Sequence, residues 1–381
     1  MFVHNAKLLP SQNVLQGDSI DILKLNSISK LANPVLEGYN VTDSSENPIG
    51  ILVRSFKMEE YAVPSSLLAV ARAGAGVNNI PHAEYAKQGI CVFNTPGANA
   101  NAVKELVIAA LIIGARNISE AINWASNLKG DDVAKQVEKG KAQFAGTEIS
   151  GKTLCVLGLG AIGRKVAVSA HALGMNIVGY DPFISENAKK EIPFVTVYDD
   201  MKASWADADF VTLHMPMTPD TKGLVNAESI RTMKDGAIVI NAARGELCDV
   251  NAIKEALTSK KIRKYVVDFP NEDCIGVDGI VAIPHLGAST EEAEDNCAVM
   301  AAQQLKDYIE NGNITNSVNL PNVKAPKNAT HRYTVISTDT GTIRFGGVSA
   351  TRNGLRYTVI DSDDDTLTFE GDDIIKARKV Y

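Results

Sequence analysis

Cysteine is scarce in this sequence, and no two cysteines stand at metal-binding spacing. Five of the 381 residues are cysteine, and none belongs to a Cys-x-x-Cys pair. Structural zinc sites and disulfide frameworks need closely spaced or numerous cysteines, so the composition predicts neither. We therefore expect no metal site, and five reduced cysteines in the core of a cytoplasmic protein.

The sequence also lacks a basic excess and a long apolar run. Its formal net charge is -7, which argues against nucleic acid as a partner because phosphate backbones are bound by basic surfaces. The richest apolar stretch, 106–115, is about half as long as the ~20 residues of a membrane helix. Residues 1–7 lack the charged-then-apolar layout of a signal peptide. These absences predict a cytoplasmic protein that binds neither nucleic acid nor a membrane.

Short apolar runs alternate with helical patterns through the middle of the chain. The predicted strands are 153–157, 177–180, 210–213, 237–240, 265–267 and 280–283. Segments between them, such as 161–173 and 250–257, have the apolar spacing of helices. This alternation predicts an α/β fold with a doubly wound parallel sheet.

Two further regions flank this sheet in the sequence. Predicted strands at 49–53, 67–71 and 90–93 indicate a second, smaller α/β unit, and helices are expected at 100–118 and 289–310. From residue 326 onward, apolar and polar residues alternate between turn signals such as Asn353-Gly354, which predicts a small antiparallel β appendage. Its predicted strands are 332–336, 342–345, 355–360, 366–369 and 374–380.

The strongest local motif is Gly158-Leu159-Gly160-Ala161-Ile162-Gly163, between a predicted strand and a predicted helix. In this context the glycines permit a tight turn, close approach of a pyrophosphate and helix–strand packing. Asp181 ends the next strand, where a carboxylate can accept bonds from a ribose and would repel a 2′-phosphate. The motif therefore favours NAD over NADP, with a flavin, an S-adenosyl group or a purely structural turn as alternatives.

Two later motifs follow predicted strands and carry ionisable side chains. Arg244, in Asn241-Ala242-Ala243-Arg244-Gly245, can fork two hydrogen bonds to a carboxylate, or can simply cap a turn. His285 can act as a base on a hydroxyl, or can be an ordinary loop histidine. An acidic loop after Asp268 could supply a carboxylate that holds the imidazole.

A basic set follows strands of the smaller unit. Arg54 and Lys57 come after one strand, and Arg72 precedes a glycine-rich loop whose amides can cradle a carboxylate. Guanidinium and ammonium groups suit a phosphate, although ordinary surface charge is the alternative. The expected substrate-binding residues are Arg54, Ser55, Lys57, Arg72, Ala75, Gly76, Val77 and Asn78.

Taken in order, these motifs resemble the D-2-hydroxyacid dehydrogenase family. The resemblance rests on 158–163, Asp181, Leu213-His214-Met215-Pro216, Thr221-Lys222-Gly223-Leu224-Val225, 241–245 and Pro284-His285. Residues 72–79, 94–97 and 285–290 are most similar to the branch that oxidises D-3-phosphoglycerate, the entry reaction of serine biosynthesis.

The resemblance implies a split architecture and a catalytic triad. An NAD-binding Rossmann domain (95–285) would be inserted in a flavodoxin-like substrate domain (1–94 and 286–324), with a β-rich, degenerate ACT-like domain at 325–381. Arg244 would bind the carboxylate, His285 would take the hydroxyl proton and Glu272 would balance the imidazolium. The implied cofactor-binding residues are Gly158, Gly160, Ala161, Ile162, Gly163, Asp181, His214, Pro216, Thr221, Ala242, Ala243, Arg244, Asp268, His285 and Gly287.

The chain departs from the family pattern at two places. One residue fewer than usual separates Asp268 from Glu272, which makes Asp273 an alternative partner of His285. The C-terminal segment shows ACT-like strands without the two helices. We expect a homodimer or homotetramer acting on 3-phosphoglycerate or 3-phosphohydroxypyruvate. The alternatives are a dehydrogenase of glycerate, lactate or glyoxylate, and a non-catalytic NAD-sensing protein similar to the corepressors of this fold.

Overall fold

The computed structural model describes residues 20–340, 346–369, 371 and 373–381. Two predictions lie outside these residues: that residues 1–7 are not a signal peptide, and that 342–345 form a strand. The chain forms two compact units. We call Ala100–Thr290 the central unit, and we call Met1–Asn99 together with Glu291–Tyr381 the flanking unit.

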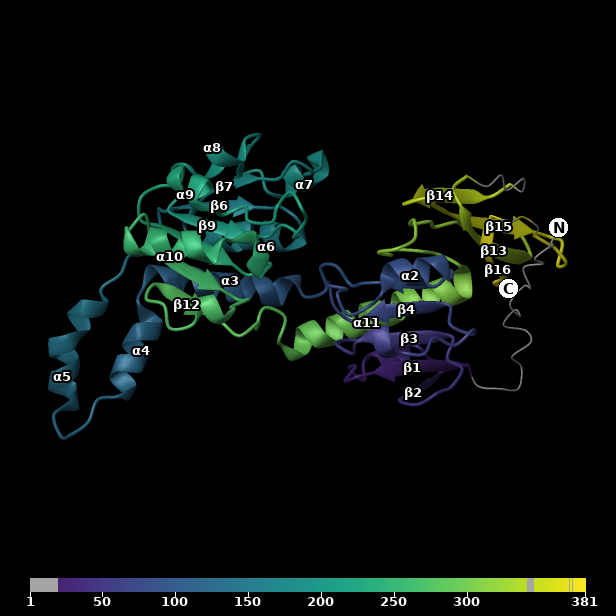
Figure 1. Ribbon diagram of the computed structural model, residues 1–381, viewed down its shortest axis with the longest axis horizontal. Coiled ribbons are helices and arrows are strands. Elements are labelled where there is room, and N and C mark those ends of the chain that lie inside the picture. Colours follow the sequence, from purple (N-terminus) through teal and green to yellow (C-terminus); the bar gives the residue numbers. More distant parts are fainter. Residues whose placement is uncertain (1–19, 341–345, 370, 372) are drawn as a thin grey trace. The chain divides into compact units, whose positions relative to one another are not determined.

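The central unit contains a seven-stranded parallel sheet (Figure 1). Its strand order, β12-β11-β10-β9-β6-β7-β8, is the 3-2-1-4-5-6 order of a Rossmann sheet with a seventh strand added at one edge. This confirms the predicted fold class. The strands are β6 (Thr153–Leu157), β7 (Asn176–Tyr180), β8 (Thr196–Tyr198), β9 (Phe210–Leu213), β10 (Ala237–Asn241), β11 (Ile262–Val267) and β12 (Ile280–Ala282).

Helices cover both faces of this sheet because its strands are apolar on both sides. Along β6, Leu154 and Val156 belong to one buried cluster, whereas Cys155 and Leu157 belong to another. Alternate residues of a strand point to opposite faces, so such a strand must be buried on both. The covering helices are α3 (Ala100–Ala115) and α6 (Ala161–Ala172) on one face, and α8 (Met201–Trp205), α9 (Ala227–Arg231) and α10 (Val250–Thr258) on the other. A short α7 (Glu186–Glu191) precedes β8.

The helix predicted at 100–118 ends earlier, at Ala115, and two more helices follow it. These are α4 (Ile118–Ser126) and α5 (Val133–Gly140), continued by the 3-10 turn η3 (Lys141–Phe144). Neither α4 nor α5 contains a buried residue, and both run away from the sheet of the central unit (Figure 1). The centroids of the Trp124 and Phe144 rings lie 5.4 Å apart, so that α4 contacts the η3 turn that follows α5.

The flanking unit contains a five-stranded parallel sheet of order β2-β1-β3-β4-β5, which is the flavodoxin-like order. Its strands are β1 (Asp21–Leu25), β2 (Asn40–Thr42), β3 (Gly50–Val53), β4 (Ala69–Arg72) and β5 (Cys91–Phe93), and its helical elements are α1 (Ala32–Val35), η2 (Met58–Glu60), α2 (His82–Lys87) and α11 (Glu291–Asn311). β1 and β2 were not predicted. Buried residues of α11, such as Leu305 and Tyr308, share a core cluster with Ile22 and Leu52 of the sheet.

The C-terminal segment forms an antiparallel sheet of order β14-β15-β13-β16. Its strands are β13 (His331–Thr338), β14 (Val348–Arg352), β15 (Leu355–Ser362) and β16 (Ile374–Lys379). Asn353 and Gly354, with φ of 50° and 79°, form the predicted two-residue turn between β14 and β15. The strand predicted at 366–369 is wrong, because these residues form a turn and irregular structure, and β14 was not predicted.

This sheet is fastened to the C-terminal end of α11. Arg378 donates to the carbonyl of Ile309 at 3.0 Å and also to that of Tyr308. Arg332, fully buried, donates to the carbonyl of Asn311 at 3.0 Å. The last carbonyls of a helix have no partner within the helix, and cations are favourable near them. The β appendage therefore caps α11 and belongs to the flanking unit by its contacts.

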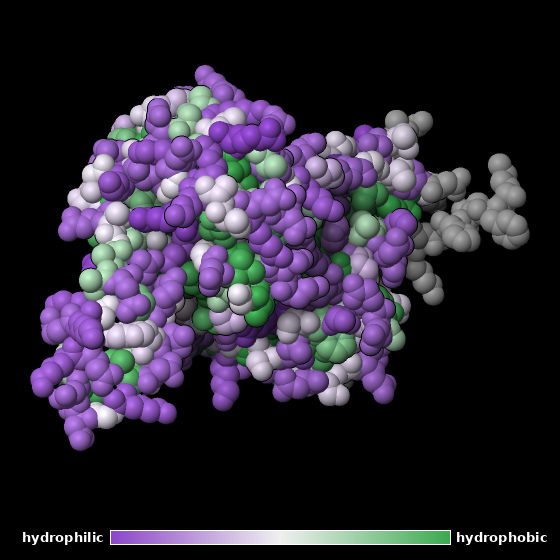
Figure 2. All heavy atoms as spheres, turned by 60° about the vertical axis from the view of Figure 1, so that its left-hand side comes forward, coloured by the Kyte–Doolittle hydropathy of each residue, from purple (hydrophilic) through white to green (hydrophobic). Residues whose placement is uncertain are grey.

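Most large apolar side chains lie inside the two units. Hydrophilic side chains predominate on the face drawn in Figure 2, where apolar residues form small separate patches. All five cysteines are buried and none is in a disulfide. Across the described ranges, we find no helix long and apolar enough to span a membrane.

Candidate dinucleotide and substrate sites

The glycine-rich loop between β6 and α6 is shaped by close backbone contacts. Gly158 has a φ of 90°, and a Cβ there would lie 2.7 Å from the carbonyl oxygen of His214. A Cβ on Gly163 would lie 1.9 Å from the carbonyl oxygen of Gly158. A Cβ on Gly160, by contrast, would have no neighbouring atom within 4 Å. Two glycines therefore allow the turn and helix packing, while the third leaves an open side for a ligand.

Asp181, at the end of β7, reaches this loop. Its carboxylate accepts hydrogen bonds from the amides of Leu159 at 2.8 Å and Phe183 at 2.9 Å. Gly160 precedes Ala161 and Ile162 at the start of α6, and no side chain caps this end. The free amides of a helix start bind anions, and a carboxylate at the neighbouring strand end accepts from a ribose. These residues fit a dinucleotide.

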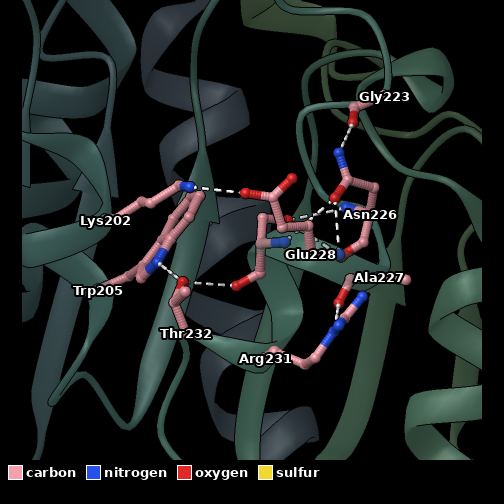
Figure 3. A network of polar contacts seen from close by, with 9 residues as sticks. Lys202, Trp205, Gly223, Asn226, Ala227, Glu228, Arg231 and Thr232 are labelled. Atoms are coloured by element: carbon pink, nitrogen blue, oxygen red, sulfur yellow. Dashed lines mark hydrogen bonds and ion pairs between the residues drawn. The ribbon is translucent and has the colours of Figure 1, made fainter.

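The loop after β9 carries Pro216 and Thr221 and is fixed by local bonds. Thr221 Oγ1 donates to the carbonyl of Pro216 at 2.7 Å. Asn226 caps α9 with a capping box and donates to the carbonyl of Gly223 at 2.8 Å (Figure 3). Trp205 and Lys202 of α8 bind Thr232 and Glu228 from the other side (Figure 3). The loop is thus held from both ends before any ligand binds.

His214 starts the same loop and is half-buried. Its ring Nε2 is 2.9 Å from Thr212 Oγ1, where the donor depends on the tautomer. Desolvation lowers the pKa of His214 to about 3. The ring therefore stays neutral at physiological pH and can only exchange hydrogen bonds.

Arg244 is positioned by Asn241, a fully buried residue at the end of β10. The Asn241 side chain accepts from the amides of Ala243 at 3.2 Å and Arg244 at 3.3 Å, and donates to the Arg244 carbonyl at 2.8 Å. Such side-chain to backbone bonds fix a loop as an Asx turn does. Asn241 begins the predicted motif, but its positioning role was not predicted.

Phe269 brings together the two principal catalytic candidates. The Arg244 guanidinium lies over the Phe269 ring at 5.3 Å, and the His285 ring lies 4.3 Å from it, tilted by 45°. Cation–π and aromatic contacts at these distances are attractive. Arg244 and His285 therefore converge from two different strand ends onto one aromatic side chain, which the sequence reasoning did not identify.

Asp268 holds the loop that carries His285. Its buried carboxylate accepts from the amides of Leu286 at 2.7 Å and Gly287 at 2.9 Å. Burial raises the pKa of Asp268, against the effect of these two bonds. A Cβ on Gly287 would lie 2.8 Å from the carboxylate, and His285 has a left-handed φ of 53°. Non-glycine residues adopt this conformation uncommonly, and it persists where the surroundings enforce it.

The structure separates the two acidic candidates of the short turn η5 (Glu272–Cys274). Asp273 forms an ion pair with Lys254, 3.0 Å away. Glu272 is exposed, and across the described residues we find no hydrogen bond to a ring nitrogen of His285. Asp273 thus has a different partner, while the Glu272 carboxylate stays available.

In the flanking unit, Arg54 and Arg72 lie at neighbouring strand ends. Arg72 Nε donates to the Arg54 carbonyl at 3.1 Å, and the Arg72 guanidinium covers Gly74, whose φ is 149°. Asn94 and Thr95 bind the glycine-rich loop at Ala75 and Gly74. Lys57, Ala75 and Asn78 are exposed, and Gly76 and Val77 are half-buried.

A cavity of about 710 Å³ opens beside Arg54, at the carboxyl ends of β1, β2 and β3. Its lining residues are Lys24, Asn26, Ser27, Ile28, Asp43, Arg54 and Ser55. In a flavodoxin-like sheet, ligands bind outside the strand ends where the strand order reverses, which is between β1 and β3. The cavity occupies this position, and its lining from β1 and β2 was not predicted.

Comparison with known proteins agrees with a dinucleotide site in the central unit. Residues 108–287 match the NAD binding domain of the D-isomer specific 2-hydroxyacid dehydrogenases. A hydroxypyruvate reductase of Thermotoga maritima is 37% identical over 249 residues, covering 63% of this chain and 77% of that protein. The chain belongs to the D-isomer specific 2-hydroxyacid dehydrogenase family. The Rossmann sheet of the central unit is therefore its NAD-binding domain.

Relatives within the family include D-3-phosphoglycerate dehydrogenases. That of Methanocaldococcus jannaschii is 39% identical over 267 residues, covering 68% of this chain and 49% of that protein. The chain thus spans about half the length of this relative. The solved structure of NAD⁺-bound 3-phosphoglycerate dehydrogenase from Entamoeba histolytica aligns with a TM-score of 0.61 and 25% identity, covering 79% of this chain and 99% of that one.

Proposed function

We propose that this protein catalyses the NAD-dependent oxidation of D-3-phosphoglycerate to 3-phosphohydroxypyruvate, the first step of serine biosynthesis. The convergence of Arg244 and His285 on Phe269 carries this proposal. Oxidation of a 2-hydroxy acid needs a group that donates two hydrogen bonds to the carboxylate and a base that accepts the hydroxyl proton. Arg244 and His285 supply these two groups. The similarity to D-3-phosphoglycerate dehydrogenases supports the choice of substrate.

Each candidate residue of the central unit has a separate role in the reaction. NAD, when bound, supplies the hydride acceptor. Arg244 binds the substrate carboxylate and polarises the C2 oxygen, and His285 takes the hydroxyl proton as the C2–H bond breaks. Glu272 balances the charge of the imidazolium, since Asp273 is paired with Lys254. Asp268 keeps the His285 loop in its left-handed conformation.

The flanking unit offers candidate groups for a phosphate. Arg54, Ser55 and Lys57 follow β3, and the loop at 72–78 offers amides together with the Arg72 guanidinium. Arginine binds phosphate and carboxylate groups with two parallel hydrogen bonds. We assign the substrate domain to 1–94 and 286–324, the NAD domain to 95–285 and the β appendage to 325–381.

A substrate panel tests the proposal. Purified protein is assayed with NADH or NADPH and 3-phosphohydroxypyruvate, hydroxypyruvate, glyoxylate or pyruvate, and absorbance at 340 nm is followed. We expect the highest kcat/KM for NADH with 3-phosphohydroxypyruvate. A higher value for hydroxypyruvate would favour the activity named for the Thermotoga maritima relative. No turnover of any substrate, with NADH still bound, would favour the NAD-sensing alternative.

We further propose a cytoplasmic homodimer or homotetramer that assembles through the central unit. The exposed Ile122 and Val133, on α4 and α5, have 61% and 40% of their surface accessible. Helices without any buried residue gain stability when a partner covers their apolar side chains. Light scattering should give at least twice the monomer mass, and Ile122→Asp should lower it.

A further inference from the structure

The cations that line the cavity in the flanking unit are already paired with acids. Lys24 lies 3.3 Å from Asp43. Arg54 Nη2 lies 2.5 Å from Glu294 Oε1. The cavity is therefore close to electrically neutral, although Arg54 is the residue that we assign to an anionic substrate.

Both partners of the Arg54–Glu294 pair sit on fixed backbone. The Arg54 carbonyl accepts from Arg72 Nε at 3.1 Å. Glu294 lies in the first turn of α11, whose following residues Cys297 and Ala298 are buried in the core. The next residue, Asp295, accepts from Ser29 at 2.5 Å and ties the same turn to the loop after β1. Both side chains therefore extend from anchored segments of backbone.

The Arg54–Glu294 ion pair is weak enough for an anion to displace it. The Arg54 and Glu294 side chains are 36% and 41% exposed, and pairs of this kind contribute only about 0.2–1 kcal/mol. A phosphate that binds Arg54 through two hydrogen bonds forms a stronger contact. The displaced carboxylate stays close, however, because its helix is fixed, and it repels a dianion.

We propose that Glu294 is a specificity-determining residue that competes with the substrate's phosphate for Arg54. This inference rests on the proposed function. Glu294 weakens the binding of phosphorylated substrates and leaves unphosphorylated 2-oxo acids unaffected, because these present no dianion to Arg54. It tunes the preference between two substrates of the same reaction and takes no part in the chemical step.

The test is Glu294→Gln, which keeps the shape of the side chain and removes its charge. We expect the KM for 3-phosphohydroxypyruvate to fall about five-fold, as about 1 kcal/mol implies. The KM for hydroxypyruvate and kcat for both substrates should stay within two-fold. Glu292→Gln is the matched control, because Glu292 is exposed in the same turn. It should change none of these constants.

Two further measurements separate the possible failures. In an Arg54→Ala background, Glu294→Gln should no longer lower the KM, since its target is gone. Calorimetric titration of the NADH-bound protein with inorganic phosphate should show tighter binding by Glu294→Gln than by wild type. If wild type turns over 3-phosphohydroxypyruvate but Glu294→Gln leaves KM unchanged or raises it, this inference alone is overturned. If wild type neither turns it over nor binds phosphate, the proposed function fails, and the inference fails with it.

Discussion

Two ways of fixing irregular backbone stand out, and the clearest examples of each lie in different units. In the central unit, side-chain oxygens at strand ends accept from main-chain amides, as Asp181, Asn241 and Asp268 do. In the flanking unit, buried guanidinium groups donate to main-chain carbonyls, as Arg332 and Arg378 do at the end of α11. The first arrangement shapes loops that meet a ligand, whereas the second closes the end of a helix.

Each unit is therefore vulnerable to a different kind of substitution. The central unit depends on glycines and neutral groups that leave no room for added atoms or charges. The flanking unit depends on long cationic side chains whose removal leaves buried acceptors unpaired. The two tryptophans, Trp124 and Trp205, both lie in the central unit, so tryptophan fluorescence reports that unit while circular dichroism reports both.

The largest effect is expected for Arg332→Ala in the flanking unit. Arg332 is fully buried and paired with Asp361 at 2.6 Å. Breaking a buried pair by removing one partner costs about 3–5 kcal/mol. In urea, the circular dichroism transition should split, with an early phase that tryptophan fluorescence does not follow. Lys324→Ala, which changes an exposed lysine of the same unit, should leave both curves unchanged. Coincident shifts of both signals would show that the two units do not unfold separately.

A smaller loss is expected for Gly163→Ala in the central unit. The added Cβ would lie 1.9 Å from the Gly158 carbonyl oxygen, and overpacking of this kind costs about 1–3 kcal/mol. Fluorescence-detected urea unfolding should show the loss. Gly160→Ala adds a methyl group in open space and should keep the stability of wild type while weakening NADH binding. Equal stability of the two variants would contradict the packing role of Gly163.

Mild acid should destabilise the central unit through His214. Its folded pKa of about 3 lies below the ordinary 6.5, so the unfolded chain binds a proton that the folded ring rejects. The associated stability is present above pH 6.5 and is lost as pH falls toward 3, by up to about 1.4 kcal/mol per pH unit. Tryptophan-detected melting between pH 7 and 4.5 measures this slope. His214→Asn should flatten it, and an unchanged slope would rule out His214 as its source.

The smallest change in stability concerns the two acids near His285. Asp273→Asn breaks a half-exposed pair with Lys254 and should cost less than about 1 kcal/mol. It should leave kcat/KM unchanged, because Asp273 is engaged elsewhere. Glu272→Gln should instead lower kcat/KM, since it removes the charge that balances the imidazolium. The reverse pattern would identify Asp273 as the partner.

The fold was predictable where burial produces a continuous apolar run. β6 and β9 were predicted with their observed bounds because their apolar residues are buried on both faces of the sheet. The strands that were missed, such as β2 and β8, are three residues long and only partly buried at sheet edges. Edge strands carry polar side chains, so their patterns resemble those of loops.

The candidate site was predictable where backbone geometry dictates residue type. Gly158 and Gly163 could be identified because a tight turn and helix packing demand glycine. The pairing of Arg54 with Glu294 joins residues that are 240 positions apart, and no local pattern encodes it. The position of Phe269 between Arg244 and His285 likewise depends on three separate strand ends.

The capping of α11 by β16 sets an order of assembly during synthesis. The central unit is one continuous stretch of chain and can fold as soon as residue 290 has emerged. In the flanking unit, β1 to β5 are synthesised before α11, which covers their sheet. The end of α11 is capped only after Arg378 has been synthesised. Ribosome-bound chains stalled with 330 residues exposed should therefore contain a protease-resistant central unit and a digestible flanking unit. Equal resistance of both units at that length would refute this order.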